Sequence, residues 1–151
     1  MQREAEEYRA SDDAQATSPS VLAMSWFRLP TQFLVDQVDL FGEPNPPLLR
    51  VAILGLAMDL PTEITRASVE GTAVVIVSGP DDLLDIRRTD DGLYLRMRSL
   101  GPLAKASVDE LQNAAARFAS DVGAYLLRYL PELASQPDLA EWFRQVERGH
   151  S

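Results

Sequence analysis

Residues 107–130, SVDELQNAAARFASDVGAYLLRYL, form the most strongly patterned stretch of the chain. Its apolar residues recur at alternating steps of three and four, which places them on one stripe of an α-helix. The stripe comprises Val108, Leu111, Ala115, Phe118, Val122, Tyr125 and Tyr129. Ser107 and Glu110 match a capping box at the start, and Pro131 cannot continue a helix. The sequence therefore predicts a helix roughly 36 Å long, around which the rest of the fold is organised.

Upstream of this helix the pattern changes to short segments that are typical of strands. Four strands are predicted, over residues 63–69, 72–77, 83–88 and 93–99. Glu70-Gly71 is expected to join the first two in a tight hairpin. Asp91-Gly92, a strongly favoured hairpin dipeptide, is expected to join the last two.

Helices are expected on both sides of the strands. Upstream, Thr31–Phe41 carries an apolar face and is followed by Gly42, a favourable residue for a helix end. Residues 48–60 fit either a helix or a buried strand, and their Leu, Ala and Met content favours the helix. Downstream, Gln136-Pro137 opens a last short helix whose apolar face is formed by Leu139, Trp142, Phe143 and Val146. The predicted fold class is α+β, an antiparallel four-stranded meander packed against the long helix, with helices before and after.

The length of 151 residues suits one domain with a core large enough to be stable without cross-links. Residues 1–20 are polar and charged without an apolar period, so we expect a disordered acidic tail followed by a single α+β domain over residues 21–151. The chain has no cysteine, which excludes a disulfide framework and suits a reducing compartment.

The net charge of −9 argues against general binding to nucleic acid or to an anionic membrane, since both require a basic face. The N-terminal residues lack the apolar core of a signal peptide. The longest apolar run, residues 48–58, is too short to span a bilayer and contains Arg50. These features predict a soluble, cytoplasmic protein without membrane insertion.

Residues that could support catalysis are scarce. Asp81, Asp82 and Asp85 match the DDxxD pattern of diphosphate-binding synthases, but they straddle a predicted turn and strand rather than a helix, which favours a solvated turn. His150 is the single histidine and lies next to the C-terminus. We therefore predict no catalytic residues, no metal site and no cofactor.

Arginines concentrate in the second predicted hairpin, at Arg87, Arg88, Arg96 and Arg98. With Asp91-Gly92 as the central turn residues, Asp85 would oppose Arg98 and Arg87 would oppose Arg96. Like charges directly opposed destabilise a strand pair. Two interpretations follow: a solvated face that tolerates the repulsion, or a contact for carboxylates of a partner. The predicted partner-binding residues are Arg87, Arg96 and Arg98.

The aromatic residues of the long helix also have two interpretations. Aromatics on one face at helical spacing usually pack into a core. The same three-four spacing is used in coiled-coil seams, so Phe118, Tyr125 and Tyr129 are candidates for a homodimer interface.

Residues 90–118, DDGLYLRMRSLGPLAKASVDELQNAAARF, combine a strand, a Leu-Gly turn and the start of the long helix. This arrangement is similar to the class I chaperones of bacterial type III secretion, over at most residues 74–130. Those chaperones are small, acidic, cytoplasmic α+β proteins that dimerise and hold the secretion segment of an effector extended. The resemblance implies a non-enzymatic homodimer that holds a segment of another protein, and the acidic composition favours a partner with basic or apolar segments.

A second class of function fits the same composition. A small regulatory or immunity protein with an acidic surface would block a basic target by charge complementarity. Both hypotheses describe a binding protein, and they differ in the kind of partner.

Overall fold

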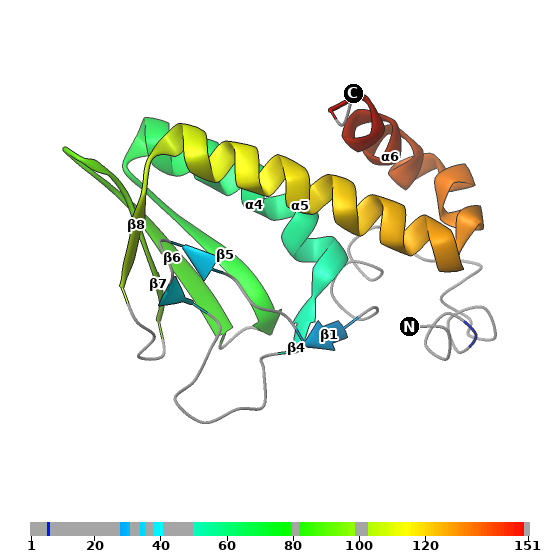
Figure 1. Cartoon of the computed structure of the whole chain (residues 1–151), viewed down its shortest axis with the longest axis horizontal. Helices are drawn as coiled ribbons and strands as arrows, with labels where there is room; N and C mark the ends of the chain where they lie inside the picture. The colour runs from blue at the N-terminus through cyan, green and yellow to red at the C-terminus, as the bar shows by residue number, and fades with distance from the viewer. Residues whose placement is uncertain are drawn as a thin grey trace.

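A four-stranded antiparallel meander and the helices around it make up most of the described structure (Figure 1). The structure is a computed structural model that describes residues 6, 28–30, 34–35, 38–40, 50–79, 82–98 and 103–149. In chain order the elements are β1 (Arg28–Pro30), β2 (Leu34–Val35), β3 (Val38–Asp39), β4 (Arg50–Ala52), α4 (Ile53–Glu70), β5 (Thr72–Gly79), β6 (Asp82–Thr89), β7 (Gly92–Met97), β8 (Ala104–Ala106), α5 (Val108–Tyr129), the 3₁₀ helix η1 (Pro131–Ser135) and α6 (Pro137–Gly149). The predicted α+β class is confirmed. Except for Glu6, the predicted tail lies outside the described residues.

The long helix α5 forms as its sequence predicts. The backbone N–H of Glu110 donates to the Ser107 hydroxyl at 3.1 Å, and the Ser107 N–H donates to the Glu110 carboxylate at 3.3 Å. This reciprocal pair satisfies two of the free donors at the helix start. The helix ends at Tyr129, two residues before Pro131.

Helix α4 corrects the first predicted hairpin. Residues 63–69, predicted as a strand, form the second half of this helix. Leu56, Leu60, Ile64 and Ala67 are spaced for one helical face, and all four are buried. Pro61 interrupts that pattern in the sequence, but the helix continues through it and changes direction along its length (Figure 1). Gly71, predicted as a hairpin residue, instead ends α4 with φ of 97° and donates its N–H to the Ala67 carbonyl.

The prediction for the segment before α4 is also wrong where the structure describes it. Residues 34–35 and 38–39 are the paired strands β2 and β3, not parts of a helix over Thr31–Phe41. Val35 and Leu40 are buried in the core. This segment therefore buries apolar side chains, as predicted, but from a short hairpin rather than from one face of a helix. Residues 48–60, which the sequence allows as helix or strand, contain both. The strand β4 pairs with β1, and the helix α4 begins directly after it at Ile53.

The hairpin of β6 and β7 exists, but its register differs from the prediction. Thr89 pairs with Gly92, so Asp90-Asp91 occupies the turn and each predicted pairing shifts by two residues. Gly92 lies at the start of β7 with φ of 141°, and a Cβ there would lie 2.8 Å from the carbonyl oxygen of Ala106. Glycine is therefore needed for close approach to β8 as well as for its backbone angle.

One face of the sheet carries the main core. Its buried side chains are Ala73, Val75, Val77, Leu84, Ile86, Leu93, Leu95, Met97 and Ala104. Helix α4 covers this face along most of its length, whereas α5 contributes Leu111 and Ala115 to the same cluster. Gln112 on α5 donates to the Thr65 hydroxyl on α4 at 2.6 Å and links the two helices. The sheet is thus covered by two helices rather than by the long helix alone (Figure 1).

A second core joins the C-terminal half of α5 to η1, α6 and the first turns of α4. Leu126, Leu130, Leu133 and Leu139 are fully buried there. The Ser120 hydroxyl donates to the Val146 carbonyl at 2.8 Å and fixes α6 against α5. Of the apolar face predicted for the last helix, Leu139 and Phe143 are buried within the same chain, and Trp142 and Val146 are partly buried against the same cluster.

Candidate partner-binding surface

The face of the sheet opposite the helices is the candidate site, and we call it the outer sheet face. Strand alternation places on it the side chains of Thr72, Val74, Ile76, Leu83, Asp85, Arg87, Tyr94, Arg96, Arg98 and Lys105. Four of these residues are cationic and one is anionic, in a chain whose net charge is −9. The outer sheet face is therefore basic within an acidic protein.

Two of the three predicted arginines surround the one carboxylate of this face. Arg96 pairs in register with Asp85. Arg98 donates two hydrogen bonds to the Asp85 carboxylate, at 2.7 and 3.2 Å. These bonds raise the pKa of Arg98 and orient its guanidinium. The predicted contact between Asp85 and Arg98 is therefore present, although Arg96 rather than Arg98 lies directly opposite Asp85.

Arg87 lies in a different environment. It pairs with Thr72 on β5 and with Tyr94 on β7, not with Arg96, so the predicted opposition of two arginines is wrong. The predicted register failed because Gly92 belongs to the strand rather than to the turn. The side chain of Arg87 is exposed, and it forms no hydrogen bond or ion pair within the part of the chain that the structure describes.

The rest of the row that contains Arg87 adds an aromatic ring and a second cation. Tyr94 pairs with Lys105 on β8, and the Lys105 ammonium lies 5.8 Å from the centre of the Tyr94 ring. Lys105 also forms an ion pair with Asp91 at 3.3 Å. Along the sheet, this row therefore presents a hydroxyl, a guanidinium, an aromatic ring and an ammonium.

Apolar side chains lie beside these cations. Val74 and Ile76 on β5 are 39% and 42% exposed, and Leu103, directly before β8, is 56% exposed. Strands of a one-sided sheet usually carry polar residues on the solvent face. The combination of cations with exposed apolar residues distinguishes this face from an ordinary solvated one. Sequence reasoning missed four residues of this face. Tyr94 was detectable, because it alternates with Arg96 along one strand. Val74, Ile76 and Lys105 were not, because the register of β5 with β6 and the strand β8 are not predicted by the sequence.

Arg88, the fourth arginine of the hairpin, has a structural role. Its guanidinium donates to the Ser68 carbonyl at 2.7 Å, in the last turn of α4. A cation at a helix C-terminus is favourable because the last carbonyls lack partners there. Arg88 therefore contributes to the end of α4 rather than to the outer sheet face.

The predicted aromatic interface lies against the second core. Phe118, Tyr125 and Tyr129 are half-buried, and all three pack against that cluster. Tyr125 and Tyr129 form an edge-to-face pair with ring centres 5.3 Å apart. These contacts agree with the first interpretation of the aromatic stripe, in which the rings pack into a core.

The carboxylate pattern at residues 81–85 lies partly outside the described residues, as does His150. Asp82 and Asp85 lie on β6, and Asp85 binds Arg98. Among the described residues, no group of three metal-ligating side chains is present.

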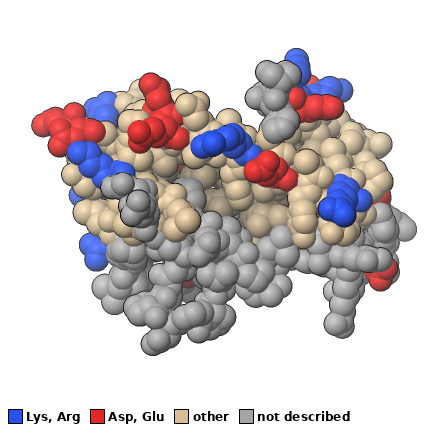
Figure 2. All heavy atoms as spheres, viewed as in Figure 1, with Lys and Arg blue, Asp and Glu red and all other residues tan. Residues whose placement is uncertain are grey.

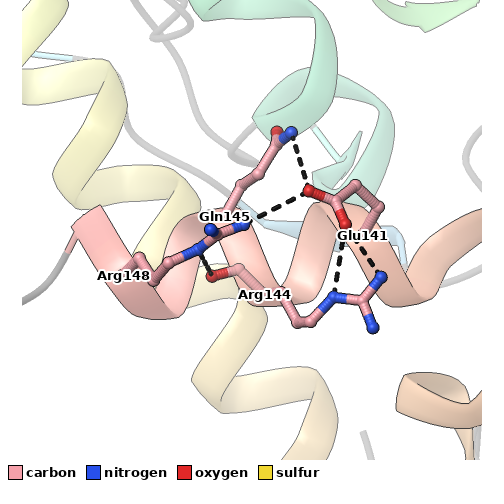
Figure 3. A network of polar contacts seen from close by, with 4 residues as sticks. All are labelled: Glu141, Arg144, Gln145 and Arg148. Atoms are coloured by element: carbon pink, nitrogen blue, oxygen red, sulfur yellow. Dashed lines mark hydrogen bonds and ion pairs between the residues drawn. The ribbon is translucent and has the colours of Figure 1, made fainter.

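A second charged cluster covers α6 (Figure 3). Glu141 accepts hydrogen bonds from Arg144, Gln145 and Arg148. Arg144 is the main cause of the lowered pKa of Glu141. All four side chains belong to one exposed helix face, which indicates a solvated network rather than a binding site. In the view of Figure 2, acidic and basic groups are likewise mixed over the described surface.

No described helix is both long enough and apolar enough to cross a membrane.

Comparison with known proteins found no match: no protein-family model, no curated protein and no solved structure is significantly similar to this chain.

Proposed function

We propose that this protein is a non-enzymatic binding protein that holds an extended segment of another protein on its outer sheet face. The observation that supports this proposal is the concentration of cations and exposed apolar side chains on that face. A chaperone or adaptor is the kind of binding protein that this surface suits, in line with the cytoplasmic role expected from the sequence.

The chemistry of the face specifies the segment that it would hold. Apolar side chains of the partner segment would lie over Val74 and Ile76. Burial of the apolar surface of both proteins then supplies binding free energy. A carboxylate would lie beside Arg87, whose guanidinium has five donors and no described partner. The partner segment is therefore apolar and acidic. This proposal replaces the basic segment that the overall charge favoured, because local charge decides a contact more than net charge does.

Substitution of Arg87 distinguishes a face that binds a partner from a face that merely tolerates an exposed positive charge. Arg98 already has a carboxylate in Asp85, and Lys105 has one in Asp91. A charge-assisted hydrogen bond from Arg87 to a partner would contribute about 1–3 kcal/mol. The other cations would steer an acidic segment towards the face and orient it.

A peptide array tests the chemistry of the partner. The array would hold pairs of extended apolar peptides that are identical except for Glu in one and Gln in the other. We expect the wild-type protein to retain the Glu peptides preferentially, and Arg87→Glu to lose that preference. Equal retention of both members of each pair would contradict the proposal.

A further inference from the structure

The two edge strands of the sheet differ in how they are protected. β8 has only three residues, and the middle one is Lys105. Short length and an edge lysine are common devices that prevent a sheet from pairing with another chain. β5 has eight residues, Thr72–Gly79, and none of them is charged or proline. The described edge of β5 therefore lacks the protection that β8 has.

The backbone of β5 offers hydrogen-bonding groups to this edge. The Arg88 N–H on β6 donates to the Gly71 carbonyl at 2.8 Å, so the carbonyl of Gly71 points to β6. Backbone groups of alternate residues point to opposite sides of an antiparallel strand. The N–H and C=O groups of Thr72, Val74 and Ile76 therefore point away from β6. Within the described residues, no strand pairs with that side of β5.

The available part of the edge is the first half of β5. β4 contacts β5 and lies close to the C-terminal end of that strand (Figure 1). The pairing with β6 also becomes irregular after Ile76. A strand added to this edge would thus pair with residues 72–76, where Val74 and Ile76 are exposed.

We propose that residues 72–76 pair antiparallel with the same residues of a second copy of this chain. The two-fold axis passes beside Val74, which faces Val74 of the partner subunit, while Thr72 faces Ile76 of the partner subunit. Each of Thr72, Val74 and Ile76 exchanges two backbone hydrogen bonds, about six in all. The two meanders join into one continuous sheet, with the outer sheet faces side by side.

The chemistry of the strand favours a second copy over an unrelated partner. Residues 72–76, TAVVI, are uncharged, so a symmetric pairing opposes no like charges. The apolar side chains of each copy meet apolar side chains of the other, as an isologous interface requires. Of the cations on the outer sheet face, Arg87 is the nearest to the axis. Three strand spacings, roughly 14 Å, and an offset of four residues along the strands, roughly 13 Å, place it about 19 Å from Arg87 of the partner subunit. That distance exceeds the screening length of about 8 Å at physiological salt.

Light scattering coupled to size exclusion tests the proposal on the full chain. At micromolar concentration we expect about twice the chain mass of 16.7 kDa. Val74→Lys and Val74→Glu should each reduce the mass to that of one chain, because like charges then oppose each other at the axis. An equimolar mixture of the two variants should restore the double mass. Circular dichroism checks that each variant remains folded.

Leu103→Lys is the matched control, because it places the same charge on an exposed apolar residue beside the other edge strand. It should leave the double mass unchanged. A wild-type monomer at all accessible concentrations, or a dimer that survives Val74→Lys, would overturn the proposal. A dimer lost only in Leu103→Lys would assign the interface to β8 instead. Arg87→Glu should keep the double mass, so dimerisation and partner binding are tested separately.

Discussion

Ile64→Ala tests the corrected assignment of α4 as the main cover of the sheet. Ile64 is 0% exposed and belongs to the cluster between α4 and the strands. The substitution removes three carbon atoms, which corresponds to about 2.4 kcal/mol of transfer free energy at about 0.8 kcal/mol each. A residual cavity adds to this loss, so we expect the free energy of unfolding to fall by about 3–4 kcal/mol. For a domain of this size, that loss lowers Tm by about 6–16 °C.

Val69→Ala is the control on the same helix, since Val69 is 71% exposed. Its effect should stay within about 0.5 kcal/mol. The two variants together also distinguish the observed helix from the strand that is predicted for residues 63–69. In a strand, Val69 would share a face with the buried Ala67, whereas in the helix it does not. Urea unfolding of both variants beside the wild type measures the difference. Equal losses for the two variants, or no loss for Ile64→Ala, would refute the helix assignment.

Three further changes test the cap, the charge and the junction between the two cores. Ser107→Ala removes the hydroxyl that accepts from the Glu110 N–H, and urea unfolding should show a loss of about 0.5–2 kcal/mol, whereas Ser107→Asp should remain close to wild type. Partial burial raises the pKa of Asp59 above its ordinary value of 3.8, so ionised Asp59 destabilises the fold as pH rises through the folded-state pKa. Asp59→Asn should therefore raise Tm at neutral pH and change it little below pH 3.8, and a gain that did not depend on pH would argue against this cause. Phe118 packs against both cores while remaining half-buried, so Phe118→Ala should cost about 2–4 kcal/mol, and an unchanged melting curve would show that the ring contributes to neither core.

The sequence predicts the elements whose local signals agree with one another. In α5, the apolar period, the capping box and Pro131 all indicate the same boundaries, and the structure has them. In α4 the signals conflict. Pro61 and the β-branched Thr65 and Val69 argue against a helix, while Leu60 and Ile64 have helical spacing. Packing against the sheet decides in favour of the helix, because propensity is weaker than burial.

The candidate site was predictable in part. The arginine cluster is visible in the sequence, but its geometry depends on the register of one hairpin. The sequence predicts Gly92 in the turn, whereas in the structure Gly92 lies at the start of β7 against the carbonyl oxygen of Ala106 on β8, a contact that the sequence of the hairpin does not reveal. A two-residue shift keeps every side chain on the same face but changes its neighbours. The faces were therefore predicted correctly, while the opposition of Arg87 and Arg96 was not.

The central claim, that the outer sheet face binds an acidic and apolar segment, is tested most directly by titration calorimetry. The titrant is the Glu-containing peptide that the array retains best, and the proteins are wild type, Arg87→Glu and Arg117→Glu. Arg117 is exposed on α5, so its substitution changes the net charge equally but on the helix layer. We predict that Arg87→Glu weakens binding by about 1–3 kcal/mol, while Arg117→Glu changes it by less than about 0.5 kcal/mol. Equal affinities for all three proteins, or equal losses for both variants, would contradict the claim.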